Sequence, residues 1–194
     1  MNPIVKTGGS LLIIAGIAAA ALGGVNAATA PTIAQKKEAS TQKAMKAVFL
    51  PTTASDADID GLAITFDEPV EVTDSDIINS YSKNSDGGYA FSITTKGFSA
   101  GLNLMVGIDK DGTVTGVKVV SHSETPGLGA NAETKLSPQF DSGKTAPLTV
   151  LKGSGASDTQ LEAITGATIT SSAVVNAVNE AYEYYENNLK GGNK

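Results

Sequence analysis

The sequence predicts an α+β fold, in which an N-terminal transmembrane helix precedes one domain with an antiparallel sheet and a C-terminal helix. Three features predict it: an uncharged apolar stretch near the start, an Asp-Gly hairpin in the middle and an amphipathic pattern at the end. The length of 194 residues suffices for one sizeable domain and an appendage.

The N-terminal stretch is expected to be a membrane anchor. Residues 7–35 contain no charged side chain, and the segment 8–28 is long enough to cross a hydrocarbon core of about 30 Å. A cleavable signal peptide is the alternative, because small residues follow the apolar run. Both interpretations place the rest of the chain outside the cytoplasm. We therefore expect a short cytoplasmic N-terminus over 1–7, the anchor over 8–28, a linker and the first part of the extracytoplasmic domain over 29–86, and a domain core over 87–190.

The segment between the anchor and the centre of the chain has weaker patterns. Residues 35–50 are expected to form a short helix that Pro51 ends, because proline lacks the N–H group that a helix needs. The polar and acidic residues 52–60 predict a surface loop. Strands are expected over 65–72 and 90–95, the second with alternating apolar and polar residues.

The clearest supersecondary pattern is a hairpin. Two apolar strands, expected over 102–108 and 113–120, flank the tetrapeptide Asp109–Gly112. An Asp-Gly turn between apolar runs is typical of a tight β-hairpin. A calcium loop is the alternative for such acidic residues, but a third acidic position and a distal Glu are missing.

The C-terminal helix is expected over 173–189. Its apolar residues recur at the three- and four-residue spacing of one buried face: Val174, Ala177, Val178, Ala181, Tyr182, Tyr185 and Leu189. Ser171 or Ser172 is the expected N-cap, since a serine hydroxyl accepts from a first-turn N–H. The other free N–H groups would then face the hydroxyl-rich turn 165–168, which suits a phosphate. A capped helix without any ligand is the alternative.

A second candidate site is the Gly/Pro-rich loop 121–129, which follows the second hairpin strand. Loops beside strand ends often carry ligands, and a plain connecting loop is an equal alternative. His122, the only histidine, is compatible with a Ser-His hydrolase, but no nucleophile elbow occurs in the chain. A dinucleotide fingerprint at 127–132 lacks the apolar helix that should follow it. A Walker A match at 142–145 fails, because Pro138 stands at its first glycine.

Composition narrows the function classes. The net charge is −6, and all 14 basic residues are lysines. An acidic chain without arginine is a poor candidate for a nucleic-acid partner, because phosphate contacts dominate such binding. The absence of cysteine excludes disulfides, thiolate metal sites and cysteine nucleophiles.

The segment Glu162–Thr168 resembles the flavinylation motif of the FMN-binding domain family, in which an acidic residue lies three positions before Ser/Thr-Gly-Ala-Thr. The family usually has Asp where this chain has Glu162. The resemblance implies that a flavin transferase uses FAD to attach FMN, through a phosphoester, to Thr168.

The loop Glu124–Gly129 resembles a Glu-Thr-Pro-Gly-Leu-Gly loop that two related families share. These are the G subunits of Rnf complexes and the C subunits of the sodium-pumping quinone reductase. Residues 25–34 are similar to the helix exit of the Rnf G subunits. The resemblance implies that this loop packs against the flavin beside the threonine motif. The cofactor-binding residues that follow from both motifs are Thr168, Thr165, Gly166, Ala167, Ile169, Thr170, Glu124, Thr125, Pro126, Gly127, Leu128 and Gly129.

The resemblance implies an electron-transfer subunit of a membrane complex that passes electrons between ferredoxin and NAD and couples this to Na⁺ or H⁺ translocation. It would act as a redox relay and not as an independent catalyst. Its partners would be the other Rnf subunits, chiefly the integral membrane ones, and the flavin transferase. The alternatives are a quinone-reductase C-type subunit, a stand-alone flavinylated carrier outside the cytoplasm, or a secreted binding module without flavin.

Overall fold

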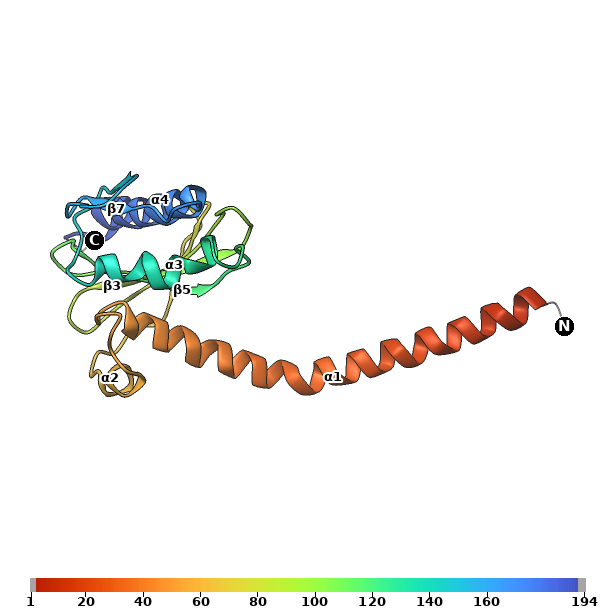
Figure 1. The fold of residues 1–194 in the computed structure, drawn as a ribbon. Coiled ribbons are helices and arrows are strands. Elements are labelled where there is room, and N and C mark those ends of the chain that lie inside the picture. Colours follow the sequence, from red (N-terminus) through yellow and green to blue (C-terminus); the bar gives the residue numbers. More distant parts are fainter. Residues whose placement is uncertain (1–2, 192–194) are drawn as a thin grey trace. The chain divides into compact units, whose positions relative to one another are not determined.

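The computed structural model describes residues 3–191, and the chain divides into two compact units, Met1–Thr41 and Gln42–Lys194. Helix α1 runs without interruption from Pro3 to Ala47, so its last turns belong to the second unit (Figure 1). Counting only the residues whose side chains the structure describes, no helix combines the length and the apolar character that crossing a membrane requires.

The second unit is built on a five-stranded antiparallel sheet, in the order β1-β2-β3-β4-β5. The strands are β1 Val70–Glu71, β2 Ile78–Lys83, β3 Tyr89–Thr95, β4 Leu102–Ile108 and β5 Val114–Ser121. The antiparallel sheet and the C-terminal helix of the predicted α+β fold are confirmed.

The predicted hairpin is present as β4 and β5. Gly112 has a φ of +90°, which a side chain would strain. The Asp109 carboxylate accepts hydrogen bonds from the N–H groups of Asp111 and Thr113, at 2.9 and 2.8 Å. The acidic side chain thus closes the turn itself, as the hairpin interpretation requires.

Two expectations between residues 52 and 83 were wrong. The predicted loop 52–60 contains helix α2, Asp56–Gly61, with a capping box: Ser55 Oγ accepts from the Asp58 N–H, and the Asp58 carboxylate accepts from the Ser55 N–H. The predicted strand 65–72 shrinks to β1 and an isolated bridge at Phe66, while β2 was not predicted.

The two faces of the sheet are covered differently. Strand alternation places Phe91 and Val106 on the face that packs against α4, in the main core. On the other face, Val48, just beyond α1, packs against Met105. There Gly107 and Gly116 stand opposite each other in β4 and β5. A Cβ built on Gly116 would lie only 2.5 Å from the Val48 carbonyl oxygen, so this approach requires glycine.

Helix α4 extends over Thr168–Tyr184 and continues as the π-helix η3, Tyr185–Leu189. The predicted apolar face is confirmed, because five of its members are buried and Tyr182 and Leu189 pack against the core. Burial raises the pKa of Tyr185, whose hydroxyl donates to the Lys110 carbonyl at 2.9 Å. The predicted start at 173 was wrong by five residues.

The connections carry the remaining elements. They are η1 Gly129–Asn131, α3 Ala132–Lys135, η2 Ser137–Phe140, and the parallel pair β6 Thr149–Leu151 and β7 Gln160–Glu162. Figure 1 shows β7 beside α4. The chain therefore passes from β5 through the loop 122–128 into η1, and from β7 directly into the turn that precedes α4.

Candidate functional site

The segment 165–170 forms a tight turn that opens helix α4. Gly166 has a φ of +78°, a conformation that favours glycine. Ala167 is the N-cap, where its side chain makes no capping hydrogen bond, and Thr168 is the first helical residue. The first-turn N–H groups of such a helix have no acceptor within the helix, and they carry its positive dipole end.

The predicted serine cap was therefore wrong. Ser171 lies inside the first turn, where its buried hydroxyl donates to the Ala167 carbonyl and accepts from the Ile164 N–H, both at 3.0 Å. It ties the turn to the helix from within. The earlier start places Thr168 within the first helical turn, and the N–H groups stay uncovered by a side-chain cap.

The loop 122–129 is folded by its own backbone. The N–H groups of Leu128 and Ala130 both donate to the Thr125 carbonyl, at 3.2 Å. Gly127 has a φ of +78°. The turn leaves Leu128 exposed and turns Glu124 inward, where only 5% of its surface remains accessible.

One cavity of about 330 Å³ brings the two motifs together. Its volume lies in the range of small-molecule sites. The lining residues come from three separate segments: Phe98, Glu124, Thr125, Leu128, Gly129, Gly166, Ala167, Thr168, Ile169 and Thr170. Nine of the twelve residues predicted from the sequence are in this set. The loop and the threonine motif, about 40 residues apart in the chain, therefore form one site.

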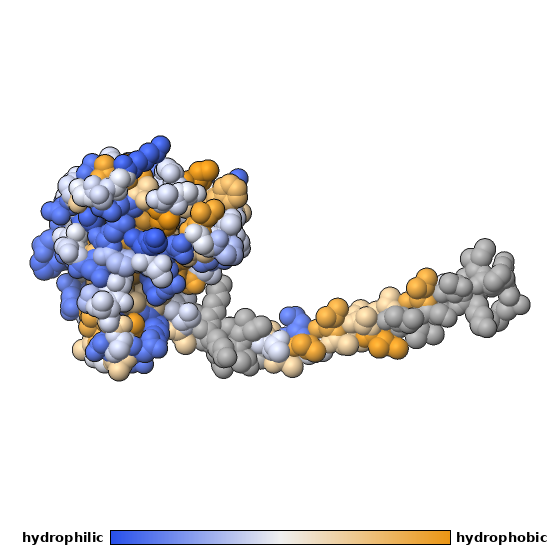
Figure 2. All heavy atoms as spheres, viewed as in Figure 1, coloured by the Kyte–Doolittle hydropathy of each residue, from blue (hydrophilic) through white to orange (hydrophobic). Residues whose placement is uncertain are grey.

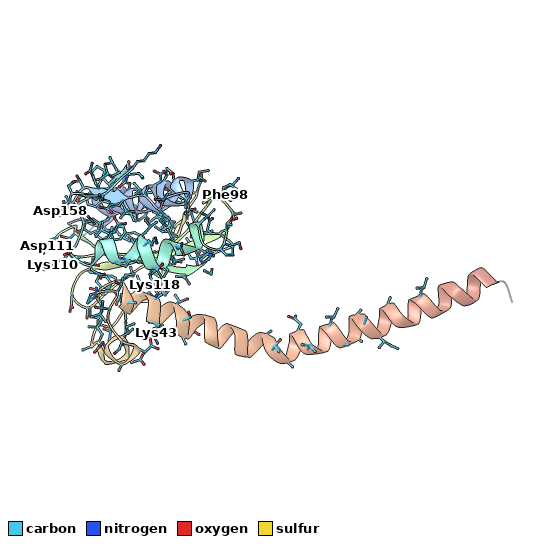
Figure 3. The ribbon with its side chains drawn as sticks, viewed as in Figure 1. Lys43, Phe98, Lys110, Asp111, Lys118 and Asp158 are labelled. Carbon is cyan, nitrogen blue, oxygen red and sulfur yellow. The ribbon has the colours of Figure 1, made fainter. Side chains whose placement is uncertain are left out.

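The cavity has an apolar rim. Phe98, Leu128 and Ile169 are 67%, 42% and 58% exposed, although large apolar side chains are usually buried. Figure 3 labels Phe98 at one edge of the second unit, and Figure 2 shows hydrophobic surface at the same place. The site therefore offers an apolar wall and, along the same lining, the start of a helix with a threonine hydroxyl.

Phe98 is the lining residue that the sequence reasoning missed. It follows Gly97, and both lie in the connection between β3 and β4. An aromatic residue between Gly97 and Ser99, outside any alternating pattern, is the feature that points to a role other than core packing.

Three predicted site residues lie elsewhere. Pro126 and Gly127 are exposed in the loop, and they are not among the described residues that line this cavity. Thr165 lines another cavity, of about 620 Å³, together with Glu162. The Glu162 carboxylate accepts from the N–H groups of Gly155 and Ala156, at 2.6 and 3.2 Å. It holds the neighbouring loop and does not face Thr168 from within the same cavity.

Two residues that were predicted to bind the cofactor are hydrogen-bonded to each other. The Thr170 hydroxyl, which was expected to bind the cofactor, donates to Glu124 Oε2 at 2.6 Å. Glu124 Oε1 accepts from the Ser99 N–H at 2.9 Å. The described part of the chain also contains no group of three or more His, Cys, Asp or Glu residues arranged to hold a metal ion.

The fold and this cavity define the class of protein. A model of the FMN-binding domain matches residues 97–183, which contain the whole lining, and a model of the RnfG N-terminal region matches residues 1–48. A solved structure with a similar fold is the C subunit of the Na⁺-translocating NADH-quinone reductase from Parabacteroides distasonis. It is 19% identical, with a TM-score of 0.58 over 84% of this chain and 98% of that chain.

Relatives similar over nearly the whole length are more specific. The G subunit of the Na⁺-translocating ferredoxin:NAD⁺ oxidoreductase complex of Acetobacterium woodii is 33% identical over 95% of this chain and 92% of its own. The G subunit of the ion-translocating oxidoreductase complex of Methanosarcina acetivorans is 36% identical over 90% of both chains. The chain belongs to the family of Rnf G subunits.

Proposed function

We propose that this chain carries FMN, joined to Thr168 by a phosphoester, and relays electrons as the G subunit of an ion-translocating ferredoxin:NAD oxidoreductase complex. The observation that carries the proposal is a cavity that residues of both motifs line together, with Thr168 among them. Electron transfer is the chemistry that a bound flavin supplies, and the protein supplies its position and surroundings.

The residues present fit the two ends of FMN. A phosphate on Thr168 Oγ1 would lie at the start of α4, where uncapped N–H groups and the helix dipole stabilise negative charge. These groups matter here because the chain has no arginine. The aromatic ring system of a flavin needs apolar contact, which Phe98, Leu128 and Ile169 offer at the rim.

Attachment requires a maturation partner, for which we propose a flavin transferase that uses FAD. The reaction forms a bond between Thr168 Oγ1 and the FMN phosphorus, breaks the phosphoanhydride of FAD, and releases AMP and the hydroxyl proton. Thr168 is partly exposed, so its hydroxyl is accessible to another protein. A covalent link retains the cofactor where free FMN is scarce.

We also propose that the segment 8–28 anchors the chain in the membrane, with the domain of 87–190 on the extracytoplasmic side. Helix α1 exposes large apolar side chains within its own unit: Leu11, Leu12, Ile17, Leu22 and Val25. Figure 2 shows this hydrophobic surface along α1. Membrane partners, chiefly integral membrane subunits of the complex, would then lie within reach for electron exchange. Retention in washed membranes, lost on deletion of 8–28, tests this placement.

The first experiment compares wild type, Thr168→Ala and Thr165→Ala, each co-expressed with a flavin transferase. Intact-mass measurement and in-gel flavin fluorescence after denaturation should show one FMN adduct in wild type and none in Thr168→Ala. Thr165→Ala is the matched control, because Thr165 lines the other cavity, and it should keep the adduct. A wild-type chain without an adduct would overturn covalent attachment and favour a binding module.

A further inference from the structure

Glu124 is a buried carboxylate whose two oxygens are both taken by protein donors. The Ser99 N–H donates to Oε1 at 2.9 Å, and the Thr170 hydroxyl donates to Oε2 at 2.6 Å. These two donors lie in segments far from Glu124 in the chain, one in the β3–β4 connection and one in the first turn of α4. Hydrogen bonds to carboxylates are stronger than neutral ones, so this single side chain joins three segments.

Two glycines leave the space that the carboxylate occupies. A Cβ built on Gly97 would lie 2.5 Å from Glu124 Oε1, and one built on Gly129 would lie 2.3 Å from Oε2 and 2.6 Å from Thr170 Oγ1. Neither glycine has a positive φ, so backbone conformation does not explain why these positions hold glycine. The close approach of the carboxylate explains it, because a Cβ would occupy the same space.

We infer that Glu124 is a positioning residue, which holds the first turn of α4 through Thr170 so that Thr168 presents its hydroxyl to the cavity. Thr170 follows Thr168 by two residues in the same turn, so a fixed Thr170 hydroxyl fixes the rotation of that turn. Because a carboxylate only accepts hydrogen bonds, as a phosphate does, Glu124 acts through Ser99 and Thr170 and not as a direct ligand of the phosphate. This inference rests on the proposed function, in which Thr168 is the acceptor of FMN.

The test is the rate of FMN attachment to the full chain by a flavin transferase, followed by intact mass at several concentrations of the acceptor chain. Thr170→Val removes the donor and keeps the shape, whereas Thr170→Ser keeps the donor. We expect kcat to fall roughly tenfold in Thr170→Val, since a hydrogen bond to a carboxylate is lost. KM should stay unchanged, because the surface that meets the transferase is intact, and Thr170→Ser should restore the rate.

A double-mutant cycle tests whether Glu124 acts through Thr170. Glu124→Ala and Thr170→Val should each slow attachment, and the double variant should be no slower than the worse single one, since both remove the same bond. Glu124→Gln keeps an acceptor oxygen and should retain more activity than Glu124→Ala. Multiplicative effects in the double variant, or equal rates for Thr170→Val and Thr170→Ser, would overturn the inference.

A readout without the cofactor separates this inference from the proposed function. Amide hydrogen exchange of the peptide covering 166–172, measured in the unmodified full chain, should speed up in Thr170→Val and Glu124→Ala while the peptide covering β4 stays protected. If wild type never carries FMN, the proposed function fails, and the exchange result still decides whether Glu124 holds the turn. Unchanged amide hydrogen exchange of this peptide in both variants would show that Glu124 does not position the turn.

Discussion

The sheet face that contacts Val48 and the cavity edge near Thr168 are held by different kinds of contact. At the first, backbone lies against backbone: glycines at 107 and 116 admit the Val48 carbonyl, which also accepts from the Thr115 hydroxyl at 2.7 Å. At the second, a buried carboxylate joins the segments, and large apolar side chains remain exposed. Polar groups have hydrogen-bond partners in both regions, but the large apolar side chains are buried only in the first.

This difference separates packing from ligand binding. A region that exists to hold the fold together buries its apolar groups, because burial stabilises the folded state. A region that leaves Phe98, Leu128 and Ile169 exposed around a cavity gains less of this stability from them. We therefore expect substitutions at the Val48 face to change the free energy of unfolding, and substitutions at the cavity edge to change the cofactor's surroundings.

The largest effect on stability is expected for Gly116→Ala. Its Cβ would lie 2.5 Å from the Val48 carbonyl oxygen, so either the strand or the end of α1 must move. Overpacking of this kind costs about 1–3 kcal/mol. Denaturant unfolding monitored by circular dichroism should show that loss in the free energy of unfolding.

Gly61→Ala is the matched control for this prediction. It ends helix α2, and a Cβ there meets nothing within 4 Å. Its free energy of unfolding should stay within about 0.5 kcal/mol of wild type. Equal losses in the two variants would mean that the loss at 116 does not come from the contact with Val48.

Much of the fold could be predicted because local patterns decide it. The hairpin needed only two apolar runs and an Asp-Gly turn, and the buried face of α4 needed only helical spacing. Strand β2, Ile78–Lys83, has a mixed sequence, and its pairing with β3 stabilises it. Helix α2 was missed although Ser55 and Asp58 have capping-box spacing, because its acidic residues resemble those of a loop.

The site shows the same limit. Its residues were predicted from two motifs, each recognisable alone, and their meeting in one cavity required the fold. The start of α4 was placed too late because Ser171 or Ser172 was expected to be its N-cap, and because Thr168, Ile169 and Thr170 are poor helix formers. Tertiary bonds hold them there, namely Thr170 to Glu124 and Ser171 to Ile164 and Ala167. Sequence spacing contains no information about those bonds.

A smaller effect on stability, with a distinct effect on the site, is expected for Gly166→Ala. A φ of +78° costs a side chain about 1–2 kcal/mol. Its Cβ would also lie 3.1 Å from Leu128 Cδ2, so Leu128 must shift at the cavity. FMN attachment by intact mass should slow, in addition to the loss in the free energy of unfolding.

Gly127→Ala separates these two contributions. Gly127 has the same φ of +78°, but a Cβ there meets nothing within 4 Å. Its loss in the free energy of unfolding should equal that of Gly166→Ala, while attachment proceeds at the wild-type rate. If both variants slowed attachment equally, loop strain and not the Leu128 contact would control the cavity.

The smallest effect on stability is expected for Phe98→Ala. The side chain is 67% exposed, so its loss should change the free energy of unfolding by no more than about 0.5 kcal/mol. Under the proposed function it lies against the flavin, and its removal admits water to the ring. The visible absorption and fluorescence of the attached flavin should therefore change, while the FMN adduct still forms.

Val70→Ala is the control for Phe98→Ala, because Val70 is 48% exposed on β1 and outside the described lining of the cavity. It should leave both stability and spectra unchanged. A flavin spectrum unaltered by Phe98→Ala would mean that the exposed apolar side chains at the rim contact something other than the flavin. The cavity edge would then differ from the Val48 face only in its contacts within the protein.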